Sequence, residues 1–96
     1  MTNLHQLERR LESAQDCAYL CRHARRPLAA EAARSTCEEI EATAARDAAA
    51  IIAAAPGSEV ATRARELAGA IGDCASECRA HMATVAARAR RQAVAS

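Results

Sequence analysis

The apolar residues of this 96-residue chain recur every three or four positions over three long stretches, which is the period of one helix face. The longest series runs in alternating steps of four and three through Val60, Ala64, Leu67, Ile71, Cys74, Cys78, His81 and Val85. Shorter series contain Leu4, Leu7, Leu11, Ala14, Cys17, Cys21 and Ala24, and then Ala33, Cys37, Ile40, Ala44, Ala48, Ile51 and Ala55. Steps of this kind are typical of helices that pack side by side. Because the longest series passes Gly69 and Gly72 without a fault, we expect one continuous helix there, with the glycines allowing a close neighbour.

Two breaks divide the chain into its predicted elements. Pro27 suits the first turn of a helix, and Pro56-Gly57-Ser58 supplies a stop, a turn and an N-cap. These signals predict helices over about residues 3–25, 28–55 and 59–92. Connections this short make neighbouring helices antiparallel. We therefore expect a single all-α domain, an antiparallel bundle of three long helices that resembles a four-helix bundle and that self-association would complete.

The composition supports helices and leaves little for a core. Of the 49 hydrophobic residues, 28 are alanine, 13 are Leu, Ile or Val, and one is aromatic. Alanine favours helix but buries little surface, and strands need branched and aromatic residues to pack. The fold is therefore expected to depend on close helix packing, self-association or a bound metal.

The charge and the apolar runs argue against nucleic acid and membrane as partners. The formal net charge is +1, and the four arginines after Glu77 suit the end of a helix. No apolar run approaches the roughly 18 residues of a membrane span, and the first residues do not form a secretory signal. The Ala- and Arg-rich composition indicates a bacterial cytoplasmic protein, in which cysteines stay reduced.

Four of the five cysteines form two pairs with equal spacing. The segment Asp16-Cys17-Ala18-x-x-Cys21-Arg22 recurs as Asp73-Cys74-Ala75-x-x-Cys78-Arg79. Residues at i and i+4 share a helix face with Cβ atoms about 6 Å apart, which is too far for an undistorted disulfide. Two thiolates each about 2.3 Å from one ion need only small rotamer changes. Cu(I) accepts two thiolate ligands whereas Zn(II) prefers four, so each pair predicts a Cu(I) site, with Zn(II) as the alternative ion.

Two further residues extend the predicted ligand set. His81 continues the second pair by one turn, and Cys37 lies on the apolar face of the second helix. Each also has a structural interpretation, His81 as a polar residue at the end of its face and Cys37 as a small core residue. Met82 is expected to fill the core or lie at the surface, and His5 and His23 to face solvent.

The two cysteine segments resemble a known protein family. Cys17-Ala18-Tyr19-Leu20-Cys21 and Cys74-Ala75-Ser76-Glu77-Cys78-Arg79-Ala80-His81 are similar to the pairs of the bacterial four-helix-bundle copper-binding and copper-storage proteins. Those helices carry C-A-x-x-C pairs that are often followed by an x-x-Cys or x-x-His step. The resemblance covers about residues 7–82 and implies a bundle interior lined with thiols that hold Cu(I). The family carries more cysteines, so the resemblance implies a relative that binds a few ions.

The leading functional hypothesis is therefore Cu(I) sequestration or buffering. The predicted metal ligands are Cys17, Cys21, Cys37, Cys74, Cys78 and His81. We expect copper ions and further copies of this chain as partners. Phosphate loops, zinc-protease motifs and hydrolase elbows are missing from the sequence, so we do not expect an enzyme. Two alternatives remain: a metal-free structural or adaptor bundle that acts by self- or partner association, and a thiol redox, Zn(II) or Fe–S site formed where the two pairs meet.

Overall fold

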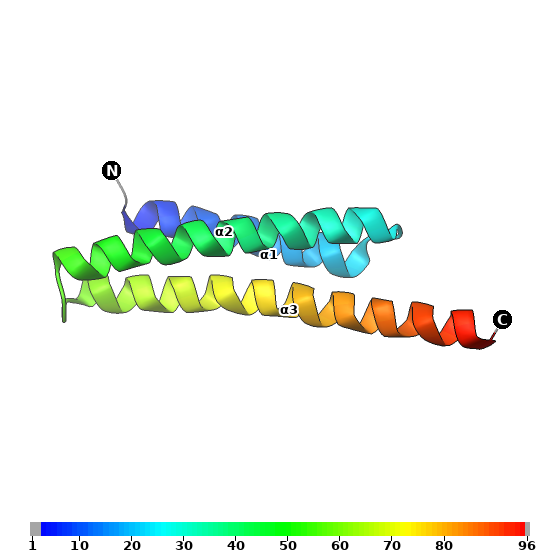
Figure 1. Cartoon of the computed structure of the whole chain (residues 1–96). Helices are drawn as coiled ribbons and strands as arrows, with labels where there is room; N and C mark the ends of the chain where they lie inside the picture. Colours follow the sequence, from blue (N-terminus) through cyan, green and yellow to red (C-terminus); the bar gives the residue numbers. More distant parts are fainter. Residues whose placement is uncertain (1–2, 96) are drawn as a thin grey trace.

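The computed structural model describes residues 3–95, which form three helices (Figure 1). These are α1 (Leu4–His23), α2 (Pro27–Ala54) and α3 (Glu59–Ala95), and the described residues contain no strand. Each helix packs against the other two, with α1 and α3 parallel and α2 antiparallel to both. The prediction of an all-α bundle of three long helices is confirmed, with bounds that differ by at most three residues.

The turn between α2 and α3 is built as its sequence predicts. Ser58 Oγ accepts a hydrogen bond from the Ala61 amide at 3.1 Å and donates one to the Ala55 carbonyl at 2.6 Å. Gly57 has a φ of 77°, a left-handed conformation that glycine adopts without steric cost. Pro27 occupies the first turn of α2. Both helix boundaries are therefore set by the backbone conformation and hydrogen bonds of adjacent residues.

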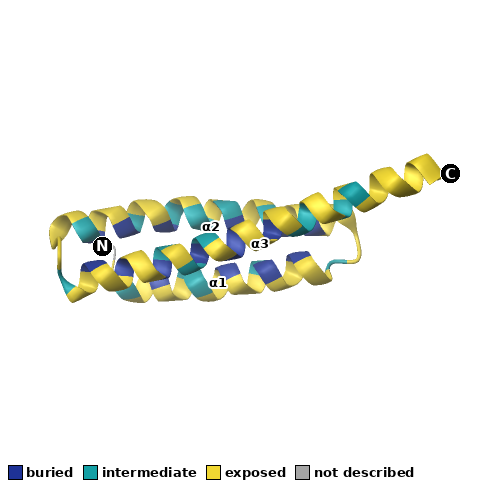
Figure 2. Cartoon of the chain, turned by 90° about the horizontal axis from the view of Figure 1, so that it is seen from below, coloured by how far each residue is buried: buried dark blue, intermediate teal, exposed yellow. Residues whose placement is uncertain are grey.

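Alanine and cysteine supply most of the core. The buried residues follow the inner faces of the three helices (Figure 2). The largest fully buried side chains are Leu7, Leu67, Ile71, Cys21, Cys37 and Cys78. Three of these six side chains are thiols, so sulfur atoms occupy core volume that leucine or phenylalanine fills in other bundles.

Some predicted positions on the helix faces are wrong. α3 is continuous as expected, but Gly69 is exposed, and a Cβ added to it would meet nothing within 4 Å. At Gly72 an added Cβ would lie 3.4 Å from a carboxylate oxygen of Glu41, so the neighbour there is a side chain. Val60 is 46% exposed because it lies in the first turn of α3, beside an open end of the bundle. Ala55 is exposed because it follows the last turn of α2.

α3 is much longer than its partners. It has 37 residues against 20 in α1, and the molecule measures 58 × 18 × 14 Å. Its last turns extend beyond the connection between α1 and α2 (Figures 1 and 2). Within 83–95 only Val85 and Ala87 are half-buried, and the other residues are exposed. We call residues 83–95 the overhang of α3.

Membrane-spanning character is not found in the described part of the chain. None of the three helices combines the length and the apolarity that crossing a bilayer requires.

Candidate metal centre

Three thiols from three different helices meet inside the bundle. Cys21 of α1, Cys37 of α2 and Cys78 of α3 are fully buried. The Cys78 thiol interacts electrostatically with the thiols of both Cys21 and Cys37. Cys37 Sγ donates a further hydrogen bond to the Ala14 carbonyl of α1 at 3.9 Å. We call these three cysteines the buried trio, and Cys78 is its central member.

The other two cysteines lie beside the buried trio. Cys17 is half-buried, and its charge, when ionised, reaches Cys37 and Cys78. Cys74 is buried, and its charge, when it is ionised, likewise reaches Cys37. The structure thus brings all five cysteines into one region of the bundle.

Burial makes these thiols reluctant to ionise. It is the largest cause of a raised pKa at Cys17, Cys21, Cys37, Cys74 and Cys78. The pKa of Cys78 rises to about 11, through burial first and then through the neighbouring Cys37. At neutral pH the thiols are protonated, so a metal ion that binds them must displace their protons.

Ion pairs cover two of the three sides of the bundle near the thiols. On the side formed by α2 and α3, Arg79 lies 3.5 Å from Glu38 and 3.4 Å from Glu41. On the side formed by α1 and α3, Arg22 lies 3.7 Å from Glu77. The arginine that follows each cysteine pair therefore contacts an acidic residue of a neighbouring helix, although the sequence alone placed Arg79 only among the arginines that suit a helix end.

The third side, between α1 and α2, has an apolar groove. Its volume is about 500 Å³. The lining residues are Cys17, Leu20, Ala24, Ala29, Ala32, Ala33 and Thr36. The groove has no charged residue in its lining, and Cys17 is the only cysteine there. The half-buried thiol is thus the one that faces a surface groove.

The structure corrects the predicted grouping of the ligands. The sequence treats each i, i+4 pair as a separate site and Cys37 as secondary, whereas Cys78 interacts electrostatically with Cys21 and Cys37 across the helices. Helix spacing reveals which face a cysteine occupies, but the pairing between helices depends on their rotation and register, which spacing does not fix. Among residues 3–95, no group of three or more Cys, His, Asp or Glu side chains already surrounds a position for a metal ion.

The histidines and Met82 lie outside the buried trio. His81 is half-buried where α3 leaves the bundle, and Met82 packs against the core. His5 and His23 are exposed, as expected. The His23 ring lies 4.3 Å from that of Tyr19, measured between centroids, and Tyr19 is itself 57% exposed.

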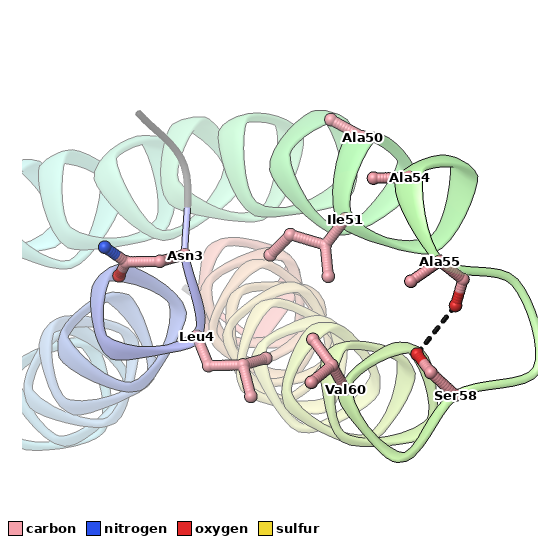
Figure 3. Close-up of a pocket in the computed structure, with 8 residues that line it drawn as sticks. All are labelled: Asn3, Leu4, Ala50, Ile51, Ala54, Ala55, Ser58 and Val60. Atoms are coloured by element: carbon pink, nitrogen blue, oxygen red, sulfur yellow. Dashed lines mark hydrogen bonds between the residues drawn. The ribbon is translucent and has the colours of Figure 1, made fainter.

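A second pocket lies at the end of the bundle where α1 and α3 begin (Figure 3). It has a volume of about 610 Å³. Its lining residues are Asn3, Leu4, Ala50, Ile51, Ala54, Ala55, Ser58 and Val60. Asn3 Oδ1 accepts a hydrogen bond from the Gln6 amide at 2.9 Å, and Ser58 is engaged in its own turn. The polar side chains of this pocket thus cap helices, and no titratable side chain lines it.

A comparison of the chain with family models, curated proteins and solved structures finds no match. The resemblance to copper-binding bundles therefore remains a prediction from the cysteine motifs.

Proposed function

We propose that this chain binds Cu(I) through the thiolates inside its three-helix bundle and thereby sequesters or buffers copper. The observation that supports the proposal is that the fully buried Cys78 thiol interacts electrostatically with the fully buried thiols of Cys21 and Cys37. Each of the three helices contributes one sulfur to this cluster, and Cys17 and Cys74 lie beside it.

The donor set suits a soft monovalent ion. Cu(I) prefers thiolate ligands and low coordination numbers, whereas a structural Zn(II) site needs four ligands. The nearby carboxylates of Glu38 and Glu41 are paired with Arg79, which leaves sulfur as the available donor. Bound Cu(I) would supply bonds between sulfurs of different helices, and any ion that binds only the folded chain stabilises it.

The proposed sequestration depends on how little water reaches the sulfurs. The buried trio is fully buried among alanine and leucine side chains. Burial away from water raises the free-energy cost of an ionised thiol, so the thiols stay protonated when no metal is bound. The same environment shields bound Cu(I) from water and oxidants. We propose a bacterial cytoplasmic location, which keeps the thiols reduced.

The test is an anaerobic Cu(I) titration against a competing chromophoric chelator. Cys78→Ala removes the central thiol, and we expect its affinity for the tightest ion to fall at least ~100-fold. Ile71→Val is the matched control, because it also removes one buried heavy atom from α3, two turns earlier. If Cys78→Ala binds as many ions as tightly as the Ile71→Val control, the proposal is wrong.

The overhang of α3 favours a second candidate function. A metal-free bundle that acts by association would use an exposed helix end, and most of residues 83–95 are exposed. This candidate predicts that replacing all five cysteines by alanine leaves the oligomeric state and partner binding unchanged. Self-association of the chain is compatible with both functions.

A further inference from the structure

We propose that Cu(I) reaches the buried trio through the groove between α1 and α2, by ligand exchange at Cys17 with a Cu(I) complex of a low-molecular-weight thiol. This inference rests on the proposed function, and it assigns to that function a route and a donor. Cys17 is then the ligand at which Cu(I) passes from the donor thiol to the protein.

The position of Cys17 joins the surface to the interior. It is the only half-buried cysteine, the other four being buried, and it lines the groove of about 500 Å³. It also lies within electrostatic reach of Cys37 and Cys78. An ion held by Cys17 is therefore at the surface and beside the buried trio at once.

The other two sides of the bundle are less suitable for passage. Arg79 bridges Glu38 and Glu41 between α2 and α3, and Arg22 pairs with Glu77 between α1 and α3. A complex that crossed either side would have to separate these ion pairs and pass charged side chains. The groove beside Cys17 has an apolar lining and presents no such barrier.

Positive charge at one end of the groove favours an anionic complex as the donor of Cu(I). Ala24 and Ala29 line this end, and the residues between them include the exposed Arg25 and Arg26. No acidic residue occurs between Cys17 and Ala30. A bis-thiolate complex of Cu(I) carries one negative charge and is attracted to this end. The groove volume also lies within the usual range for small ligands, roughly 300–1,000 Å³.

The exchange balances without any change of oxidation state. The Cys17 thiol loses its proton to one donor thiolate as its sulfur bonds to Cu(I), and that donor leaves as a neutral thiol. Cys37 then displaces the second donor thiolate in the same way. Two protein thiols have given up protons and two donor thiols have left, so the single negative charge of the complex is conserved. Later exchanges among Cys37, Cys78 and Cys21 move the ion inward.

The experiment measures the rate of uptake separately from affinity. Stopped-flow mixing of the full chain with Cu(I)–glutathione, under anaerobic conditions, follows the ultraviolet charge-transfer band of Cu(I) thiolates. Cys17→Ser is expected to slow uptake about tenfold, because a hydroxyl does not replace a thiolate in the exchange. Ala32→Leu, which fills the groove, is expected to slow uptake about fivefold while the equilibrium affinity stays unchanged. Ala45→Leu is the matched control, an exposed alanine of α2 outside the groove, and it should react at the parental rate.

A charge test adds an independent readout. The double variant Arg25→Gln/Arg26→Gln should lower the uptake rate about tenfold at low ionic strength and remove most of its salt dependence. Equal uptake rates in the parent, Cys17→Ser and Ala32→Leu would overturn the route while leaving Cu(I) binding intact. A parent chain that binds no Cu(I) at equilibrium would overturn both the proposed function and this inference.

Discussion

Single cysteine residues combine two properties in this molecule, because each sulfur is both core volume and a potential ligand. Cys21, Cys37 and Cys78 are as completely buried as Leu7 and Leu67. A buried cysteine packs as a small hydrophobic residue, and its thiol is a weak hydrogen-bond donor. A mutation at one of these positions therefore alters packing and metal chemistry together, which is why controls that remove a similar volume are needed.

The raised pKa of Cys78 predicts a loss of stability at alkaline pH. Burial and the neighbouring Cys37 raise this pKa from 9.0 to about 11 in the folded chain. The stabilising contribution is therefore fully present below pH 9.0 and disappears as the pH rises through about 11. The free energy of unfolding should fall by roughly 3 kcal/mol across this range on account of Cys78. Cys17 on α1 and Cys37 on α2 face the same thiol and act in the same direction.

Anaerobic urea unfolding, followed by far-ultraviolet circular dichroism at a pH below 9.0 and at one above about 11, measures this loss. The Cys78→Ala chain should lose less stability between the two conditions than the parent. An equal loss in both chains would show that Cys78 titrates normally.

Helix ends are the elements that local sequence signals describe best. The turn with Pro56, Gly57 and Ser58, and Pro27 at the start of α2, could be predicted because each acts on adjacent backbone groups. The rotation of each helix about its axis was predictable only from the apolar faces. This prediction is correct for Leu67 and Ile71, which are buried, and wrong for Val60, which is exposed at the open end of the bundle.

The candidate site was predictable as a set of thiols but not as an arrangement. Spacing placed Cys74 and Cys78 on one face, and both are buried. The interaction between Cys37 and Cys78 depends on the register of α2 against α3, which is set by packing along the full helices. The groove beside Cys17 has no sequence signal either, because small residues such as Ala29 and Ala33 also occur where helices pack without a groove.

The cap of α3 gives a prediction at the scale of elements. Ser58→Ala removes the hydrogen bond to the Ala61 amide and the one to the Ala55 carbonyl. The free energy of unfolding should fall by about 1 kcal/mol. Urea unfolding measures the change, with Ser35→Ala as the control because Ser35 is exposed within α2. A Ser58→Ala chain as stable as its control would mean that the turn is held by Gly57 and Pro56 alone.

At the scale of the whole molecule, the overhang of α3 lies outside the packed three-helix bundle. The described residues from Arg88 onward are exposed, and Val94 is 88% exposed. They contribute almost no burial to the bundle of one chain. A complete four-helix cross-section at this end would need three helices from other copies.

Truncation after Ala87 tests this division. We expect the free energy of unfolding to change by less than about 0.5 kcal/mol, because the described residues that the truncation removes are all exposed. Sedimentation equilibrium should show a smaller assembly for the truncated chain than for the full chain. Identical molecular masses for both would contradict self-association through the overhang, and a large loss of stability would contradict the independence of the bundle.

Because Tyr19 is exposed, the interior of this molecule contains no tyrosine or tryptophan ring. Tyr19 is the only aromatic residue of the chain, since neither tryptophan nor phenylalanine occurs, and it lies at the surface against His23. Fluorescence from this ring reports on a patch of α1 outside the core. Apart from the peptide groups, the sulfurs are therefore the chromophores inside the bundle, and their transitions become strong when the thiols are bound to metal.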